Sequence, residues 1–482
     1  MTTLEPDAAD LAEGRRSFWL LFPVVSLAMF VSFGDNTIVA TALPALAAEF
    51  GEPTRAPLII SAYLVAMMVA APVFGRLGDA FGHKPMLRPA AGLFIAASGL
   101  CILAPEFWAL VAFRSVQGIG AGGLVALASA LLAERIPPRQ RAGYQGYIAT
   151  FVVGSYATGP ILSGLLTEFA DWRAIFLLNI PFGLAILWFA RRLPDRDLPR
   201  APFQLDIAGV FLLAIFVGAL VAISEAGARD TRVAATLGGA AAVALILFII
   251  QERRSTHPLI PPAVISDSSI RRVNLAVMLY GVCSVPLLVV LPIYYRTVHG
   301  LSSSEIGISM LPISVGLVVS SLATGQLVAR TGMVLSWAVC GMTGMSLVLA
   351  GFSLVPGLSL HAILFGLFFI GLGMGTVLGP VQIVVQLAAA ASDLGSASST
   401  IHVSRLMGAA CGTALSSTIL YVVLSRDPSA QALFEGLMTR SDVPAEIRPG
   451  TFDAAFSAIF GAIALMALAC AAVAASVPLR KL

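Results

Sequence analysis

Two residues of opposite charge lie within long apolar stretches of this sequence. Asp35 is the only acidic residue deep inside such a stretch, nine residues before Pro44, and Arg114 lies eight residues after Glu106. If both stretches are membrane-spanning helices, a rise of 1.5 Å per residue places the two charges about 12–13 Å below one membrane face. Since a carboxylate in hydrocarbon is costly, Asp35 is expected to face Arg114. An Asp35 that leaves Arg114 on taking a proton would couple protonation to a conformational change, and a permanent structural ion pair is the alternative.

A second group of polar residues lies in the C-terminal part of the chain. His402 and Arg405 are three residues apart and share a face of an expected helix. Arg405 lies about 16 Å from the helix start near Leu394, close to mid-membrane. A cation there suits an anionic or zwitterionic substrate group, and pairing with backbone carbonyls is the alternative. Further candidates for a substrate cavity are glutamines in apolar stretches: Gln117, Gln382 and Gln386. For the last two, an interfacial polar cap is the favoured alternative.

The composition requires a membrane environment for these charges. Of 482 residues, 58% are hydrophobic and 11% are charged, whereas soluble domains have about 45–50% apolar and about 25% charged residues. This balance excludes soluble enzymes and nucleic-acid binding proteins. No acid–base pair, metal-ligand cluster or nucleophile constellation lies at one depth, so neither an enzyme nor a metal site is expected.

One glycine pattern imitates a cofactor motif. Gly118-Ile-Gly120-Ala-Gly122-Gly123 matches GxGxxG, but dinucleotide binding needs a preceding strand and a helix start at the glycines. The pattern instead falls in the middle of an apolar stretch, where small residues indicate close helix packing. We therefore expect no cofactor.

Fourteen apolar runs are long enough to span a bilayer. They lie at roughly 18–41, 56–75, 87–104, 107–133, 143–167, 174–190, 207–224, 233–250, 273–294, 306–327, 334–354, 359–381, 395–424 and 454–477. With a cytoplasmic N-terminus, 19 of the 29 lysines and arginines fall in loops on the inner side and 8 on the outer side. This asymmetry predicts an all-α, multi-pass protein of the cell inner membrane with 14 transmembrane helices and both termini cytoplasmic.

An internal repeat divides the chain. Gly75-Arg-Leu77 reaches Gly82 after seven residues, and Gly325-Gln-Leu327 reaches Gly332 at the same spacing. Repeated halves are typical of facilitator transporters. We predict an N-terminal six-helix bundle over 1–190, a linker with two inserted transmembrane helices over 191–270, and a C-terminal six-helix bundle over 271–482.

The stretch from Gly75 to Lys84 joins the second and third expected helices. Gly75 and Gly82 permit a tight turn. Asp79 is placed to accept hydrogen bonds from the N-terminus of a neighbouring helix, and Lys84 to pair with carboxylates. A simple basic inner loop is the alternative.

The expected fifth helix carries small residues on one face. Gly154, Gly159 and Gly164 allow a neighbouring helix to approach closely, and Pro160 bends the helix. Such a bent seam suits a hinge, and ordinary small-residue packing is the alternative.

Several of these motifs resemble those of one transporter family. The run from Asp35 to Pro44 is similar to the helix-1 signature of the 14-helix drug:proton antiporters of the major facilitator superfamily. Arg114-Ser-Val-Gln117-Gly-Ile-Gly120 resembles the helix-4 motif, whose arginine is implicated in proton transfer. The run from Gly154 to Gly164 resembles the antiporter motif of exporters.

The resemblance implies the major facilitator fold and a cytoplasmic gate at Gly75–Lys84 that holds the outward-facing state. Ala80 and His83 stand where basic residues are usual in this motif. The gate is therefore expected to be weaker, or tuned by pH through His83.

The expected function is proton-coupled export of small amphipathic compounds, as in multidrug efflux and antibiotic resistance, by a monomer that exchanges substrate for protons across the lipid bilayer. The alternative is a dedicated transporter of one metabolite, peptide or lipid, possibly anionic or zwitterionic.

Overall fold

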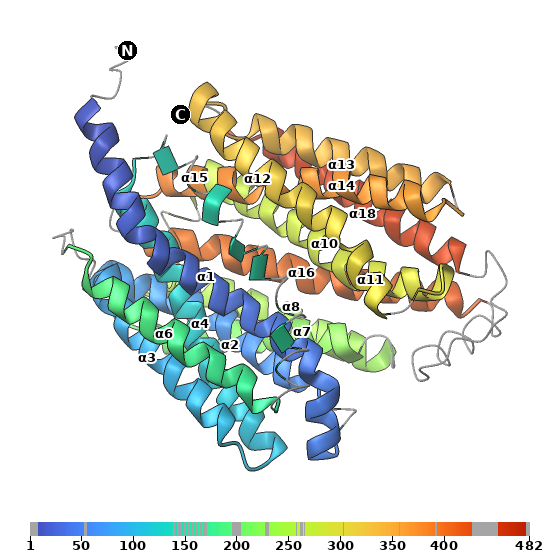
Figure 1. Cartoon of the computed structure of the whole chain (residues 1–482), viewed down its shortest axis with the longest axis horizontal. Coiled ribbons are helices and arrows are strands. Elements are labelled where there is room, and N and C mark those ends of the chain that lie inside the picture. The colour runs from blue at the N-terminus through green and yellow to red at the C-terminus, as the bar shows by residue number, and fades with distance from the viewer. Residues whose placement is uncertain are drawn as a thin grey trace.

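The computed structural model consists of long helices in two groups (Figure 1). It describes residues 8–52, 55–137, 140–141, 144, 146–148, 151–152, 154–155, 159, 162–163, 166, 171–194, 204–226, 231–256, 258–260, 264, 266–301, 303–355, 357–390, 393–426 and 452–478. Expected site residues Pro160 and Gly164 lie outside these ranges.

The first group holds the helices before residue 192. They are α1 (Ala8–Phe50), α2 (Leu58–Phe81), α3 (His83–Ile102), α4 (Phe107–Arg135) and α6 (Arg173–Arg191). Their buried apolar residues form two clusters, one around Phe94 and Leu124 and the other around Ile59 and Phe176. Polar and charged residues inside this half are therefore enclosed by apolar neighbours.

The second group holds the helices after residue 267. They are α10 (Ser268–Val298), α11 (Ser303–Ser309), α12 (Leu311–Thr331), α13 (Ser336–Leu354), α14 (Leu360–Gly375), α15 (Leu378–Ala388), α16 (Leu394–Leu424) and α18 (Asp453–Ala475). One apolar cluster, which includes Leu287, Met342 and Ile459, holds them together. Because α2 packs on α4 here as α12 packs on α14, the two groups repeat the same pairing.

Two further helices, α7 (Ile207–Ala226) and α8 (Thr231–Arg254), lie between the groups in the sequence. They pack on each other and share a fourth apolar cluster with Met68 of α2 and with Leu406 and Met407 of α16. The pair thus contacts both halves on one flank of the molecule.

The described residues contain twelve helices that are long and apolar enough to cross a membrane. They include Ala235–Arg254 of α8, whereas the apolar part of α7, Ile207–Ile223, is shorter than the span length. Most of the expected fifth helix, 143–167, lies outside the described ranges. The chain is therefore multi-pass, and the count of 14 stays a prediction.

The repeated glycines end equivalent helices. Gly82 follows α2 with φ +96°, and Gly332 follows α12 with φ +70°. Their amides donate to the carbonyls of Gly78 and Val328, four residues earlier. Because side chains disfavour positive φ, glycine is the residue that terminates a helix in this way.

The glycine run in α4 packs against its neighbours, as expected from its position in the helix. A Cβ at Gly120 would lie 2.7 Å from the amide nitrogen of Phe94 on α3, and one at Gly118 would overlap the carbonyl of Tyr63 on α2. These glycines bring three helix backbones together close to Arg114, which lies four residues before the run begins.

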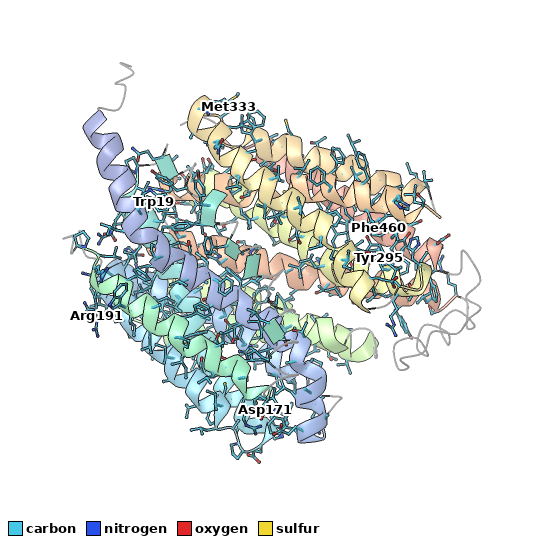
Figure 2. All side chains as sticks on the ribbon, in the orientation of Figure 1. Trp19, Asp171, Arg191, Tyr295, Met333 and Phe460 are labelled. Carbon is cyan, nitrogen blue, oxygen red and sulfur yellow. The ribbon has the colours of Figure 1, made fainter. Side chains whose placement is uncertain are left out.

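We call the end of the molecule where α2 meets α3 the α2–α3 end. Trp19 and Arg191 lie toward this end of the first half, and Asp171 lies at the opposite end (Figure 2). The last turns of α4, α6 and α8 all carry arginine, so basic residues gather here.

Candidate functional site

A fully buried polar cluster surrounds Asp35 in the first half. The exposed fractions of Asp35 and Arg114 are 1% and 0%, and Nη1 of Arg114 donates to Oδ2 of Asp35 in an ion pair. Gln117 and Asn179 both donate to Oδ1 of the same carboxylate. Residues of α1, α4 and α6 thus converge on one carboxylate, and the equal depth of Asp35 and Arg114 is reflected in their contact.

Arg114 has one donor that the cluster does not use. Nη1 also donates to Oε1 of Gln117 at 2.6 Å, and Nε donates to the Ile59 carbonyl at 3.4 Å. The guanidinium lies 4.1 Å from the ring centroid of Tyr63. Nη2 is buried and donates to no described residue. The ion pair is therefore held by several contacts, and Nη2 of Arg114 can still donate a hydrogen bond to a new partner.

A cavity with a volume of about 190 Å³ lies between the two halves. Phe33 and Ser129 contribute to its wall from the first half, and Gln382, His402 and Arg405 from the second. The rest of its described lining is mainly apolar, with several serines. This composition suits a small amphipathic ligand.

Close packing of α10 and α16 sets the position of Arg405. A Cβ at Gly281 of α10 would lie 2.9 Å from the amide nitrogen of Ala409 and would overlap the Arg405 carbonyl. The two backbones touch here, so α16 is fixed in rotation. The Arg405 guanidinium consequently lies 5.1 Å from the ring centroid of Phe33 on α1.

Two glutamines expected in the cavity wall lie elsewhere. Gln117 belongs to the buried Asp35 cluster, where it also donates to Oγ of Ser98 at 2.9 Å. Gln386 lies between the halves at the α2–α3 end, where it donates to the carbonyl of Ser129 at 3.2 Å. Gln386 lies about one helical turn after Gln382 on α15. Gln382 therefore reaches the cavity, whereas Gln386 lies one turn closer to the α2–α3 end.

The two halves are joined at the α2–α3 end by hydrogen bonds to Asp79. Its carboxylate accepts from the amides of Gly395 and Ser396 at 2.7 and 2.9 Å and from the Ser396 hydroxyl at 2.7 Å. These amides begin α16, so Asp79 does contact the N-terminus of a neighbouring helix. A Cβ at Gly75 would lie 2.7 Å from the Gly395 carbonyl oxygen, which explains the need for glycine at this crossing.

His83 links Asp79 to a second carboxylate. Nε2 lies 3.2 Å from Asp79 Oδ1, and Nδ1 lies 3.0 Å from Oε2 of Glu134 on α4. An imidazole with a carboxylate at each nitrogen satisfies both contacts as donor only when it is protonated. Lys84 donates to the Leu193 carbonyl after α6.

Arg141 forms a further bridge between the halves. It donates to Oε1 of Gln386 at 2.7 Å and to the carbonyls of Ala133 and Ile136 at 2.6 and 2.7 Å. Burial lowers the pKa of Arg141 to about 10, so it keeps its charge at neutral pH. Across the same interface, Oγ of Ser129 lies 3.3 Å from Nε2 of His402.

The glycines of the expected fifth helix have different surroundings. A Cβ at Gly159 would overlap the Thr37 hydroxyl on α1, whereas one at Gly154 would meet none of the described residues within 4 Å. Close approach to α1 therefore requires glycine at position 159 and not at 154. Pro160 and Gly164 of the same motif lie outside the described residues.

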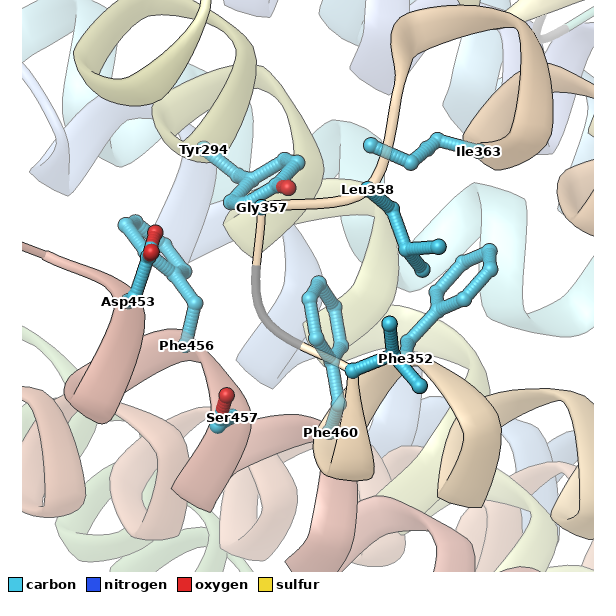
Figure 3. A pocket seen from close by; sticks show the side chains of 10 residues that line it. Tyr294, Phe352, Gly357, Leu358, Ile363, Asp453, Phe456, Ser457 and Phe460 are labelled. Carbon is cyan, nitrogen blue, oxygen red and sulfur yellow. The ribbon is translucent and has the colours of Figure 1, made fainter. Parts of the chain in front are cut away.

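A small pocket at the opposite end of the second half does not form a ligand site. Tyr294, Asp453, Phe456 and Phe460 surround it (Figure 3), and its volume is about 10 Å³. That space is close to the lower limit for one water molecule.

The sequence matches the model of the Major Facilitator Superfamily over residues 25–413. The chain belongs to this superfamily. Among relatives, an uncharacterized MFS-type transporter of Mycobacterium tuberculosis is 31% identical over 434 residues, which cover 88% of this chain and 62% of that protein. The multidrug transporter protein MdtP of Bacillus subtilis is 29% identical over 419 residues, covering 85% and 76%. This chain thus spans less than two thirds of the mycobacterial relative.

The solved structures include facilitator folds of similar shape. The human organic anion transporter MFSD10 (TETRAN) matches with a TM-score of 0.65 and 19% identity, over 93% of this chain and 99% of that chain. At this identity the similarity concerns the fold alone.

Within this facilitator protein, two contacts of the Asp35 cluster were not anticipated. Neither Asn179 nor Tyr63 carries a charge, so the search for buried charges did not select them. The signal that could have found Asn179 is its isolation: it is an amide within an apolar helix, eight residues after Asp171.

Proposed function

We propose that this facilitator exports small amphipathic compounds across the inner membrane in exchange for protons, by alternating access to the cavity between its halves. The observation that carries the proposal is the buried ion pair of Asp35 and Arg114. A carboxylate held at this depth is a group that a single proton can neutralise.

Protonation of Asp35 would leave Arg114 as an uncompensated buried cation. Removing one partner of a buried pair costs about 3–5 kcal/mol, which is enough to shift a two-state equilibrium strongly. The unused Nη2 of Arg114 offers a donor for a new contact. Proton binding at Asp35 would thus favour a different packing of α1, α4 and α6. This repacking would open the cavity toward the opposite side of the membrane.

The α2–α3 end is proposed to be cytoplasmic, because its arginines follow the positive-inside rule. The bonds from Asp79 to α16 and from Arg141 to Gln386 hold the halves together at this end. They support assignment of the present arrangement as closed to the cytoplasm. Export is favoured by the similarity to MdtP of Bacillus subtilis, a relative named as a multidrug transporter.

The test is drug transport in proteoliposomes driven by an imposed pH gradient. We expect Asp35→Asn to reduce gradient-driven transport of a panel of amphipathic drugs at least tenfold, while exchange of drug for drug without a gradient persists. Glu106→Gln is the matched control, since Glu106 is an exposed carboxylate at the start of α4 with no capping hydrogen bond from its side chain. Unchanged gradient-driven transport in Asp35→Asn would refute proton coupling at this residue.

A further inference from the structure

Arg114 and Arg405 both lie far from the ends of long apolar helices, and their surroundings differ. Arg114 is paired with Asp35 and fully buried. Arg405 borders the cavity. Its side chain forms no ion pair or hydrogen bond with the described residues, and its guanidinium lies over the ring of Phe33. A cation–π contact compensates only part of the cost of removing a guanidinium from water.

A second group in the same wall also has an unused donor. Gln382 is 6% exposed, and its Nε2 is buried with no acceptor among the described residues. A buried amide N–H without a hydrogen-bond acceptor destabilises the folded protein. Gln382 and Arg405 both line one cavity, so its wall contains a positive charge and an amide N–H that has no acceptor among the described residues.

The remainder of the described cavity wall carries no compensating negative charge. It contains no aspartate or glutamate, and its polar members apart from Gln382, His402 and Arg405 are hydroxyl groups such as Ser129, Ser284 and Ser314. Next to a positive guanidinium, this wall repels a cationic ligand and attracts an anionic one.

We propose that the cavity selects amphipathic anions, namely compounds with one carboxylate or sulfonate on an apolar body. The anionic group accepts from Arg405, whose guanidinium offers paired donors that match a carboxylate, and from Nε2 of Gln382. The apolar body lies along Met29, Phe33 and Leu288. This inference rests on the proposed function, because it names the substrate class of the same cavity.

The binding of the anion also involves both halves. Phe33 belongs to α1, two residues before Asp35, and Arg405 belongs to α16. The guanidinium contacts the Phe33 ring with its face and can bind an anion with its edge, so substrate and proton act on opposite sides of one segment of α1.

The test is equilibrium binding to the full-length protein in nanodiscs, measured by calorimetry with three probes of one shape: 2-naphthylacetate, 2-naphthylacetamide and 2-(2-naphthyl)ethylammonium. We expect the acetate to bind at least tenfold more tightly than the ammonium compound. Arg405→Gln should abolish this preference while leaving the affinity for the neutral amide within twofold. Arg405→Lys, which keeps the charge, should retain most of the preference.

Arg271→Gln is the control variant. Arg271 borders a separate cavity of about 230 Å³ behind α16, together with Phe216 and Met407, so its substitution should change none of the three affinities. The proposal is overturned if the ammonium compound binds as tightly as the acetate, if Arg405→Gln keeps the preference, if Arg271→Gln removes it, or if no probe binds. Loss of proton coupling with the anion preference intact would instead count against the proposed antiport alone.

Discussion

At the scale of single residues, the position of Asp35 shows what helix register can predict. The depths of Asp35 and Arg114 follow from the residue count to one helix end, because the rise per residue is constant. Their contact was therefore predictable as a distance from the membrane face. The additional partners Asn179 and Tyr63 were not predictable, because the rotation of α2 and α6 about their axes depends on packing between helices.

A second carboxylate on α1 gives a prediction for pH. Oε1 of Glu49 accepts from Arg173 at 2.8 Å, and Oε2 accepts from the indole N–H of Trp172. The hydrogen bond from Arg173 lowers the pKa of Glu49 below its usual value of 4.5. Because the pKa is lowered in the folded state, the stabilisation is present above about pH 4.5 and is lost as the pH falls through the folded-state pKa.

Trp172 fluorescence should report this titration. In a variant with Trp172 as the sole tryptophan, we expect an emission change below pH 4.5 that moves to higher pH in Arg173→Gln. Asp171→Asn, which removes the other carboxylate on Arg173, should move the transition only slightly. Identical transitions with and without Arg173 would contradict the assigned cause of the shift.

At the scale of helices, the contact of Asp79 with α16 joins elements that are distant in the sequence. A partner at a helix N-terminus was predictable from the loop between α2 and α3, but Gly395 is 316 residues away. Which helix supplies those amides depends on how the halves dock. The same limit explains why Gln386 was expected in the cavity and lies in the interface between the halves.

The crossing of α2 and α16 gives a prediction for conformation. A Cβ at Gly395 would lie 2.9 Å from Asp79 Oδ1 and would overlap the Gly75 carbonyl. We expect Gly395→Val to separate the halves at the α2–α3 end, with a stability loss of about 1–3 kcal/mol typical of overpacking. Spin labels on α2 and α16 near this crossing should show a longer distance in a pulsed electron resonance measurement.

Gly344→Val is the control for that experiment. It adds the same side chain to α13 at a glycine whose Cβ would meet nothing within 4 Å, so the distance should not change. An unchanged distance in Gly395→Val itself would show that the crossing tolerates a side chain.

At the scale of the whole molecule, the repeat in the sequence predicted twin halves, and the structure has two groups of helices with the same pairing. The placement of α7 and α8 was not predictable, because nearly uniform apolar surfaces do not indicate which neighbour they contact. They cover Met68 of α2 and Leu406 of α16 on one flank, where lipid would otherwise lie.

This placement predicts that the pair is dispensable for folding. A lipid tail is as apolar as the surfaces that α7 and α8 cover, so their removal costs little driving force in a membrane. We expect a variant in which a short flexible linker replaces residues 204–260 to insert and remain monodisperse, with its melting temperature lowered by a few degrees. Size-exclusion chromatography and thermal unfolding test this, and aggregation of the variant would show that the pair is structurally essential.

The hydrogen bonds between the halves also bear on the speed of transport. Asp79, Arg141, Gln386 and Ser129 supply six contacts between the halves at one end, and all must break before the cavity can open there. Each hydrogen bond contributes a net stabilisation of about 1 kcal/mol. The opening rate falls about tenfold for every 1.4 kcal/mol of this stabilisation that is lost before the transition state is reached. We therefore expect turnover to be limited by the rupture of this interface rather than by substrate diffusion, and to rise steeply with temperature.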